Sequence, residues 1–390
     1  MTTAARVQAR GGSMVLAALA LAHLVNDSFT ALLTPLLPSL QASFGVSIAQ
    51  TTALVAVSSF VSSMLQPLFG AWGDGSARRS LAAIGPLVCA LGMVWLGFAP
   101  AFSIVVLLVA ISGVGSAVFH PAAIALVHAE SKPAQRGLFA ALFSSAGTAG
   151  LAVGPVTATL LGLRGLPFLI PVAVLTSAIV WTATRDNGRA VPVVKRTWRQ
   201  YAKVFHGPMR TLWAMGVLRS VSTIAWQTMV GFTLVARGQG VHLGPALATF
   251  SIASALGGIL GGRISDRVGR IPVLRSSIIA TIPVFVALVY STPSNWWFYP
   301  LAALAGVMVN ANIPVSVVTA QEYAPDNVAT ASALMMGFTW GTAGVLMLVV
   351  GIIADYTSPQ TAMVVSISML LPALWLTMRL PEPSSITSHP

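Results

Sequence analysis

The chain has 390 residues, of which 56% are hydrophobic and only 8% are charged, and its mean hydropathy is +0.83. Soluble globular chains carry about a quarter of their residues as charged side chains, so this composition excludes a soluble domain and predicts an integral membrane protein. The formal net charge of +12 does not indicate nucleic-acid binding, because the basic residues gather in the breaks between apolar runs.

Twelve apolar runs each have the length of about 20 helical residues that spans a bilayer. The runs are continuously apolar instead of alternating, which indicates helices and not a β-barrel. The expected spans are 13–38, 47–72, 80–99, 102–128, 137–163, 166–184, 211–236, 244–264, 272–291, 296–320, 329–354 and 360–379. The first run is too long for a cleavable signal and is expected to stay in the mature protein. Cys89 is the sole cysteine, which excludes an intramolecular disulfide.

The basic residues predict the orientation of these spans. With a cytoplasmic N-terminus, every Lys and Arg except Arg164, Arg219 and Arg237 falls in an inside segment or at its edge. The positive-inside rule therefore places both termini in the cytoplasm. We expect a multi-pass protein of a bacterial-type inner membrane.

The first span carries an unusual polar group. In "AHLVNDSFT", residues 22–30, the spacing of His23, Asn26 and Asp27 puts all three on one helical face. Asp27 is the only carboxylate well inside a span, where a charge costs a few kcal/mol. It should face a central cavity and have a partner, so we predict that Asp27 and His23 take part in proton coupling and that Asn26 and Asp27 contact substrate.

A second histidine is expected at the same depth. His120, in the fourth span, lies about as far from its membrane face as His23 does, and Pro121 removes a helical hydrogen bond beside it. We predict that His120 handles protons or substrate; the alternative is that each histidine only hydrogen-bonds a neighbouring helix. His23, Asp27 and His120 also have the ligand types of a divalent-metal site, which is a further alternative.

A basic segment divides the chain. Residues 185–210 hold seven basic residues and one acid, and we interpret them as a cytoplasmic linker that can lie on anionic lipid headgroups. The predicted domains are 1–184, the N-terminal six-helix bundle; 185–210, the linker; 211–380, the C-terminal six-helix bundle; and 381–390, a cytoplasmic tail.

The second half supplies one deep cation. Arg219 is the only basic residue well inside a span, and it occupies the place in the seventh span that corresponds to Asp27 within about one turn. We predict that Arg219 faces Asp27, directly or through water, and binds substrate. The other polar or aromatic residues predicted to contact substrate are Gln66, Trp226, Gln227, Asn310, Asn312 and Trp340.

The two halves resemble each other at an offset of about 193 residues. "GAWGDGSARR" at 70–79 matches "GRISDRVGRI" at 262–271, and "GTAG" occurs at 147–150 and again at 341–344. Between these matches, Pro121 and Glu130 correspond to Pro314 and Glu322. Such a duplicated six-helix unit predicts a substrate site near the bilayer midplane between the repeats.

These motifs resemble the major facilitator superfamily over nearly the whole chain. "GRISDRVGR" follows that family's loop between the second and third spans, G-x-x-x-D-R-x-G-R; the first copy has Gly75 and Ala77 where arginine and glycine are usual. The resemblance implies the major facilitator fold of twelve helices, with helices one and seven beside the cavity. Gating residues at the inner helix ends are then expected to be Asp74, Arg78, Arg79, Glu130, Asp266, Arg267, Arg270 and Glu322.

A narrower resemblance covers about residues 20–160. "HLVND", "SSMLQPLFGAWGD" and "GSAVFHPAA" are similar to the fosmidomycin-resistance branch, a group of bacterial inner-membrane drug exporters. That branch usually has a glutamate and an arginine where this chain has Ala122 and Ala125. In the fifth span, Gly150, Gly154 and Pro155 resemble part of a helix motif of drug/proton antiporters, and close helix packing is the alternative role of these residues.

These features predict a secondary transporter driven by the proton gradient. We expect proton-coupled efflux of a small polar or anionic organic compound by a functional monomer without a cofactor. The alternatives are import of an organic anion or sugar derivative and transport of a divalent metal or metal chelate. No nucleotide loop, nucleophile elbow or HExxH motif occurs, so we do not expect an enzyme.

Overall fold

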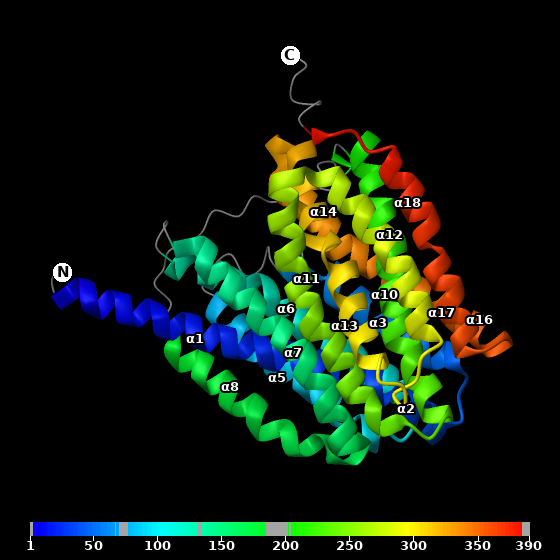
Figure 1. Cartoon of the computed structure of the whole chain (residues 1–390). Coiled ribbons are helices and arrows are strands. Elements are labelled where there is room, and N and C mark those ends of the chain that lie inside the picture. Colours follow the sequence, from blue (N-terminus) through cyan, green and yellow to red (C-terminus); the bar gives the residue numbers. More distant parts are fainter. Residues whose placement is uncertain are drawn as a thin grey trace. The chain divides into compact units, whose positions relative to one another are not determined.

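The structure is a computed structural model of the chain, and it describes residues 3–66, 68–69, 77–131, 135–184, 202 and 204–383 (Figure 1). Within these ranges all regular secondary structure is helical, which confirms the predicted all-α class. Asp74 and residues 185–201 of the predicted linker lie outside the described residues.

The described helices are consistent with twelve membrane crossings. Nine stretches are long and apolar enough to cross a membrane, and one of them, Leu138–Ala183, covers the predicted fifth and sixth spans. The two remaining predicted spans correspond to α3 (Ile48–Met64), which is apolar but short, and to α10 (Gly207–Ala236), whose middle carries Arg219.

The chain separates into two compact units. Unit 1 comprises Met1–Leu36 and Phe60–Lys195, and unit 2 comprises Leu37–Ser59 and Arg196–Pro390. Residues 37–59 belong to the first half of the sequence but pack with the second half. The domain boundaries given above stay a prediction.

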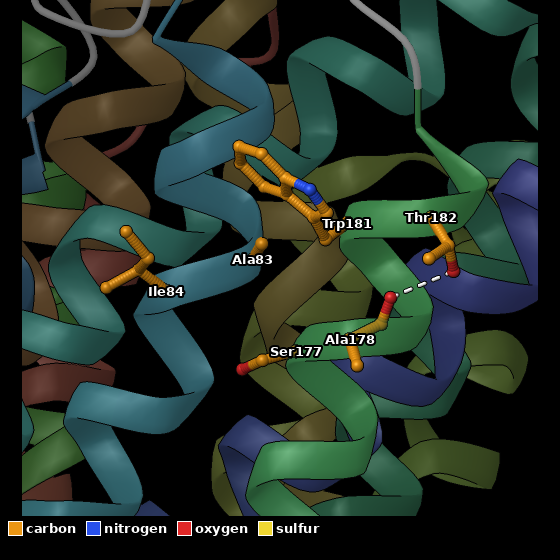
Figure 2. A pocket seen from close by; sticks show the side chains of 6 residues that line it. All are labelled: Ala83, Ile84, Ser177, Ala178, Trp181 and Thr182. Carbon is orange, nitrogen blue, oxygen red and sulfur yellow. Dashed lines mark hydrogen bonds between the residues drawn. The ribbon is translucent and has the colours of Figure 1, made fainter.

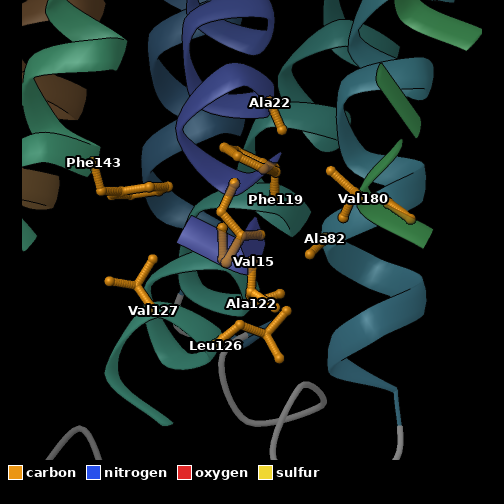
Figure 3. Close-up of a cluster of buried hydrophobic side chains, with 12 residues drawn as sticks. Val15, Ala22, Ala82, Phe119, Ala122, Leu126, Val127, Phe143 and Val180 are labelled. Carbon is orange, nitrogen blue, oxygen red and sulfur yellow. The ribbon is translucent and has the colours of Figure 1, made fainter. Parts of the chain in front are cut away.

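Unit 1 is built around one apolar core. Leu19, Phe119 and Val180 are fully buried in it, and Phe143 belongs to the same cluster. Figure 3 shows Phe119, Val180 and Phe143 among its members. Because these residues come from different helices, the core holds the whole of unit 1 together. The helices of this unit are α1 (Thr3–Ala31), α5 (Arg78–Val94), α6 (Phe102–Glu130), α7 (Arg136–Gly165) and α8 (Ile170–Ala183), with 3-10 turns at Leu96–Phe98 and Leu166–Leu169. Helix α2 (Leu33–Phe44) passes from this unit into unit 2, and α3 returns from unit 2 to this unit.

Unit 2 has an aromatic core. Trp226 is 1% exposed, and its ring centroid lies 4.8 Å from that of Phe250 and 6.2 Å from that of Phe285. The helices of this unit are α10, α11 (Leu243–Val268), α12 (Arg270–Val289), α13 (Phe298–Asn310), α14 (Asn312–Tyr323), α15 (Val328–Ala333), α16 (Thr339–Tyr356), α17 (Pro359–Ser368) and α18 (Leu370–Met378), with 3-10 turns at Gly240–His242 and Pro325–Asn327 and a π-helical turn at Leu334–Phe338.

Two breaks in the helices require glycine. Gly162 kinks α7 at φ 58°, and Gly269 joins α11 to α12 at φ 94°; side chains with a Cβ rarely adopt these backbone angles. Gly269 is the glycine of "DRVGR" at 266–270, in the second copy of the loop motif, so the motif's glycine has a conformational reason there.

Candidate functional site

A cluster of three ionisable side chains surrounds Asp27 within unit 1. His23, one turn earlier on α1, places its Nε2 3.3 Å from Asp27 Oδ2. His120, on α6, places its Nε2 3.3 Å from Asp27 Oδ1. The two imidazole centroids are 5.1 Å apart, so the predicted common depth of His23 and His120 is confirmed.

The hydrogen bond at Nδ1, the nitrogen of each imidazole that does not face Asp27, determines which ring nitrogen carries a proton. His23 Nδ1 lies 2.7 Å from the Phe143 carbonyl oxygen, and His120 Nδ1 lies 2.8 Å from the Ser116 carbonyl oxygen. A carbonyl oxygen only accepts hydrogen bonds, so each Nδ1 carries a proton and donates it. In a neutral ring, the Nε2 that faces Asp27 is then a bare acceptor.

This geometry allows a proton to be held between each imidazole and the carboxylate. An imidazole lone pair and a carboxylate oxygen are both acceptors, so neither His23 nor His120 can hydrogen-bond Asp27 unless a proton lies between them. The proton can reside on Nε2 or on the carboxyl group. The three ligand atoms also lie within 4.8 Å of one another, so the divalent-metal alternative stays open.

Asn26 supports the carboxylate from the same helix. It is fully buried, and its Nδ2 donates to Asp27 Oδ1 at 3.0 Å and to Ser116 Oγ at 3.4 Å. Its Oδ1 has no hydrogen-bond partner among the described residues. Asn26 therefore stabilises Asp27 and ties α1 to α6, and its predicted contact with substrate stays a prediction.

Glycines of α7 allow this helix to lie against the cluster. A Cβ on Gly147 would fall 2.8 Å from Asp27 Oδ2, and one on Gly150 would fall 2.9 Å from the Ser28 nitrogen. A Cβ on Gly154 would fall 2.7 Å from Ala31 Cβ. The face that contains Gly150 and Gly154 thus packs on α1, and Pro155 lies next to it inside α7. The antiporter meaning of this motif stays a prediction.

Two contributors to the cluster were missed by the sequence reasoning. Phe143 gives its carbonyl to His23 and stacks on the same ring at 4.1 Å between centroids, and Gly147 leaves the space that His23 fills. The available signal was their helical spacing: Phe143, Gly147, Gly150 and Gly154 follow one face of α7.

Arg219, on α10, is the buried charged residue of unit 2 that corresponds to Asp27 of unit 1. The side chain is 3% exposed, and its Nη2 donates to Ser220 Oγ at 2.8 Å. Its Nε and Nη1 are buried without a partner in the described part of the chain. The Trp340 ring centroid lies 5.9 Å from the guanidinium carbon. The predicted pairing of Arg219 with Asp27 would join the two units and stays a prediction.

The remaining substrate candidates have different surroundings. Trp226 belongs to the aromatic core of unit 2 described above. Asn312 is fully buried, donates to Leu274 O at 3.3 Å and Ser277 Oγ at 3.1 Å, and accepts from Ser316. Packing and hydrogen bonding within unit 2 account for both residues without a ligand.

Three further substrate candidates are partly exposed. Gln66, just beyond the end of α3, donates to Ser62 O of that helix at 2.9 Å. Gln227, on α10, and Asn310, at the end of α13, are also only partly buried. The roles of these three residues in substrate binding stay predictions.

The gating candidates form a network in unit 2. Arg270 donates to Asp266 Oδ1 at 2.6 Å and to Glu322 Oε1 at 3.1 Å, so it joins the α11–α12 junction to α14. Arg267 is exposed. In unit 1, Arg78 is buried, Arg79 binds the Trp181 carbonyl of α8, and Glu130 ends α6. Their action as a gate stays a prediction.

A further acid was not predicted to have a role. Asp355, near the end of α16, accepts hydrogen bonds from the backbone nitrogens of Ile48 at 2.8 Å and Ala49 at 2.9 Å. The carboxylate therefore caps the N-terminus of α3, where helices leave backbone donors unsatisfied. This contact fastens residues 48–49 to α16 within unit 2.

Comparisons with known proteins match this architecture. The family model described as Major Facilitator Superfamily matches residues 19–244 and 223–390. The fosmidomycin resistance protein of Escherichia coli K12 is 28% identical over 97% of this chain and 95% of its own length. An uncharacterised MFS-type transporter of Bacillus subtilis 168, YfnC, is 26% identical over 87% of this chain and 86% of its own length.

Solved structures share the fold. A bacterial homolog of the human lysosomal transporter Spinster, in an inward-facing and unoccupied conformation, has a TM-score of 0.77 at 16% identity and covers 95% of this chain and 98% of that chain. The nucleoside transporter NupG has a TM-score of 0.75 at 15% identity, with 94% and 99% covered. At these identities the likeness concerns the fold alone.

Proposed function

Because this chain belongs to the Major Facilitator Superfamily, whose model matches nearly all of it, we propose that it exports a small polar or anionic organic compound in exchange for protons. The similarity to the fosmidomycin resistance protein over 97% of the chain supports efflux. We do not extend the proposal to fosmidomycin itself, because Ala122 and Ala125 replace two charged residues usual in that branch.

The observation that carries the proposal is the cluster around Asp27. Each imidazole commits its Nδ1–H to a backbone carbonyl and directs its Nε2 at the carboxylate, so protons are needed to hold His23 and His120 against Asp27. When the protons leave, the acceptors that face one another repel, and a different packing of α1 and α6 becomes favourable. Proton binding and conformation are coupled in this way.

Arg219 supplies the attraction for an anionic substrate. A buried cation without a charged partner is destabilising, and an anion that binds its Nε and Nη1 offsets that cost. The guanidinium stays protonated at all physiological pH values, so this attraction does not depend on the proton supply. We therefore expect the attraction to persist when Asp27 is replaced by a neutral residue.

The test is to replace Asp27 by asparagine. A sensitivity screen of a deletion strain and an overexpressing strain, with fosmidomycin and a panel of carboxylates and phosphonates, first identifies a compound with opposite shifts. In inverted membrane vesicles with an imposed pH gradient, Asp27→Asn should abolish compound-driven proton flux, measured with a pH-sensitive dye, while exchange of labelled compound for unlabelled compound persists.

Asp326→Asn is the matched control, because Asp326 is exposed in a 3-10 turn of unit 2. It should leave both measurements unchanged. If Asp27→Asn still concentrates the compound against its gradient, the coupling scheme is wrong. If overexpression sensitises cells and deletion protects them, the direction is import, the principal alternative.

Heat measured on titrating the purified protein with transition-metal ions, lost in Asp27→Asn, would instead support the metal alternative.

A further inference from the structure

A shallow groove lies between α5 and α8 on unit 1, away from the Asp27 cluster. Its volume is about 280 Å³, at the lower edge of the range of about 300–1,000 Å³ that small-molecule pockets occupy. It is lined by Ala83 and Ile84 of α5 and by Ser177, Ala178, Trp181 and Thr182 of α8 (Figure 2). The groove is open along one side.

The lining favours an apolar occupant. Ile84 and Trp181 are 49% and 45% exposed. The Thr182 hydroxyl donates to Ala178 O of its own helix at 2.9 Å, as the dashed line in Figure 2 shows. A hydrocarbon chain can cover these surfaces without breaking a hydrogen bond.

Ser177 is the exception among the hydroxyl groups of this face. Its Oγ is buried and has no hydrogen-bond partner among the described residues. Thr176 and Thr182, the neighbouring hydroxyl residues of α8, both donate to a carbonyl one turn earlier. In Figure 2, Ser177 is instead directed from α8 toward α5. Because that oxygen is covered, the surface that the groove offers to an occupant is apolar.

Positive charge marks the end of the groove at Trp181. The guanidinium carbon of Arg79 lies 4.0 Å from the centroid of the Trp181 ring, and Nε and Nη2 donate to Trp181 O at 3.0 and 2.5 Å. These contacts hold the cation in place but do not neutralise it, because a carbonyl and an aromatic ring carry no charge. Helix α5 begins beside it with no acidic residue in its first turn and no side-chain cap.

Charge and apolar surface occur here in the order of the groups in a glycerophospholipid. Arg79 stacks on Trp181 at one end of the lining, and Ile84 follows Arg79 by five residues on α5, which is about 7.5 Å along a helix. A phosphate at Arg79 would therefore leave an acyl chain to run past the Trp181 ring along the apolar lining to Ile84. We propose that this groove binds a phospholipid with an anionic headgroup, with its phosphate at Arg79 and one acyl chain along Ile84 and Trp181.

The second repeat provides a natural control. Arg275 donates through Nε and Nη2 to Thr377 O at 3.3 and 3.2 Å, and residue 275 follows 79 by the same 196 positions as 377 follows 181. Each unit therefore contains the same hydrogen bond, from an arginine to a carbonyl near the C-terminal end of that unit's last helix, α8 or α18. Threonine offers no ring on which the cation can stack, so the pair in unit 2 lacks the cation–aromatic contact of unit 1.

The experiment measures lipid binding to the purified, delipidated full-length protein. Phosphatidylglycerol and phosphatidylcholine with identical acyl chains are titrated separately, and bound lipid is counted by native mass spectrometry and followed by the thermal unfolding midpoint. The unaltered protein should retain phosphatidylglycerol preferentially. Arg79→Gln should weaken phosphatidylglycerol binding about fivefold and abolish the preference, while Arg275→Gln should preserve it.

A second variant keeps the assignment testable if Arg79→Gln does not fold. Ile84→Trp fills the groove and leaves Arg79 in place, so phosphatidylglycerol retention should fall although the charge is unchanged. Equal retention of both lipids by the unaltered protein would overturn the proposal, as would an equal loss in Arg79→Gln and Arg275→Gln. If inorganic phosphate alone reproduces the shift in the unfolding midpoint, the site binds free phosphate and the lipid assignment is wrong.

Discussion

Helices α1 and α10 begin the two sequence repeats, yet their buried charges have opposite surroundings. Asp27 on α1 is contacted by two imidazoles and an amide, whereas Arg219 on α10 has one hydroxyl partner and two nitrogens without any in the described chain. The charge of the Asp27 cluster can change, because carboxylate and imidazole both titrate. The charge of Arg219 is permanent.

This difference suggests how the two repeats of a duplicated fold can take different roles, one in proton binding and the other in anion binding. Under the proposed function, the group that responds to protons has partners that also exchange protons, and α1 and α6 supply them in unit 1. Under the proposed function, Arg219 attracts the anion with a fixed charge, and Asp27 is the acid that we predict to face it. The predictions below separate the two tasks.

The largest effect is expected for Arg219→Gln. Removing a buried charged partner of a ligand costs about 2–5 kcal/mol, so the apparent affinity for an anionic compound should fall about thirtyfold or more. Binding of the compound found in the sensitivity screen is measured by thermal shift and by labelled-compound exchange. Arg237→Gln is the matched control, since Arg237 follows the same helix and is exposed. Unaltered affinity in Arg219→Gln would remove the anion site from unit 2.

A smaller effect is expected for Gly147→Ala. The new Cβ would lie 2.5 Å from His23 Cε1 and 2.8 Å from Asp27 Oδ2, so the cluster must shift. Overpacking of this kind costs about 1–3 kcal/mol of stability, and we expect coupled proton flux to fall while compound affinity at Arg219 is kept.

Gly258→Ala makes the same change in unit 2, where the nearest atoms would be 4.0 Å from the Cβ, and it should be silent. Coupled flux is measured with the dye assay and stability by thermal unfolding. If Gly147→Ala couples normally, the tight packing of α7 on the cluster is unimportant for transport.

The all-helical fold was predictable because apolar runs of membrane length leave few other choices. The packing of residues 37–59 with the second half was not. It depends on small residues that let backbones approach: a Cβ on Gly344 would lie 2.5 Å from Ser59 Oγ, and one on Gly351 would lie 2.7 Å from Ala49 Cα. Glycine occurs throughout membrane helices, so such contacts have no distinctive sequence pattern.

The candidate site was predictable in its ionisable members but not in its supports. His23 and Asp27 are linked by helical spacing, and the depth of His120 follows from span boundaries. The Phe143 and Ser116 acceptors are backbone carbonyls, which every residue type has, so no pattern of side chains in the sequence predicts them. Trp226 and Asn312 show the converse limit, because an aromatic or amide side chain in a span can be satisfied entirely within the core of its own unit.

The smallest effect is expected for Asp355→Asn. This variant tests whether a carboxylate at the end of a membrane-spanning helix contributes to proton coupling as Asp27 is proposed to do. Asparagine keeps the shape but has one acceptor oxygen, so one of the two bonds to Ile48 and Ala49 is lost together with the charge at the α3 N-terminus. The free energy of unfolding should fall by about 1 kcal/mol, which lowers the thermal unfolding midpoint by about 2–4 °C. The ratio of protons to compound should stay unchanged, because the partners of Asp355 are backbone amides, which do not titrate. A variant that uncouples transport as fully as Asp27→Asn would show that proton coupling is not confined to the cluster in unit 1, and the division of tasks between α1 and α10 would fail.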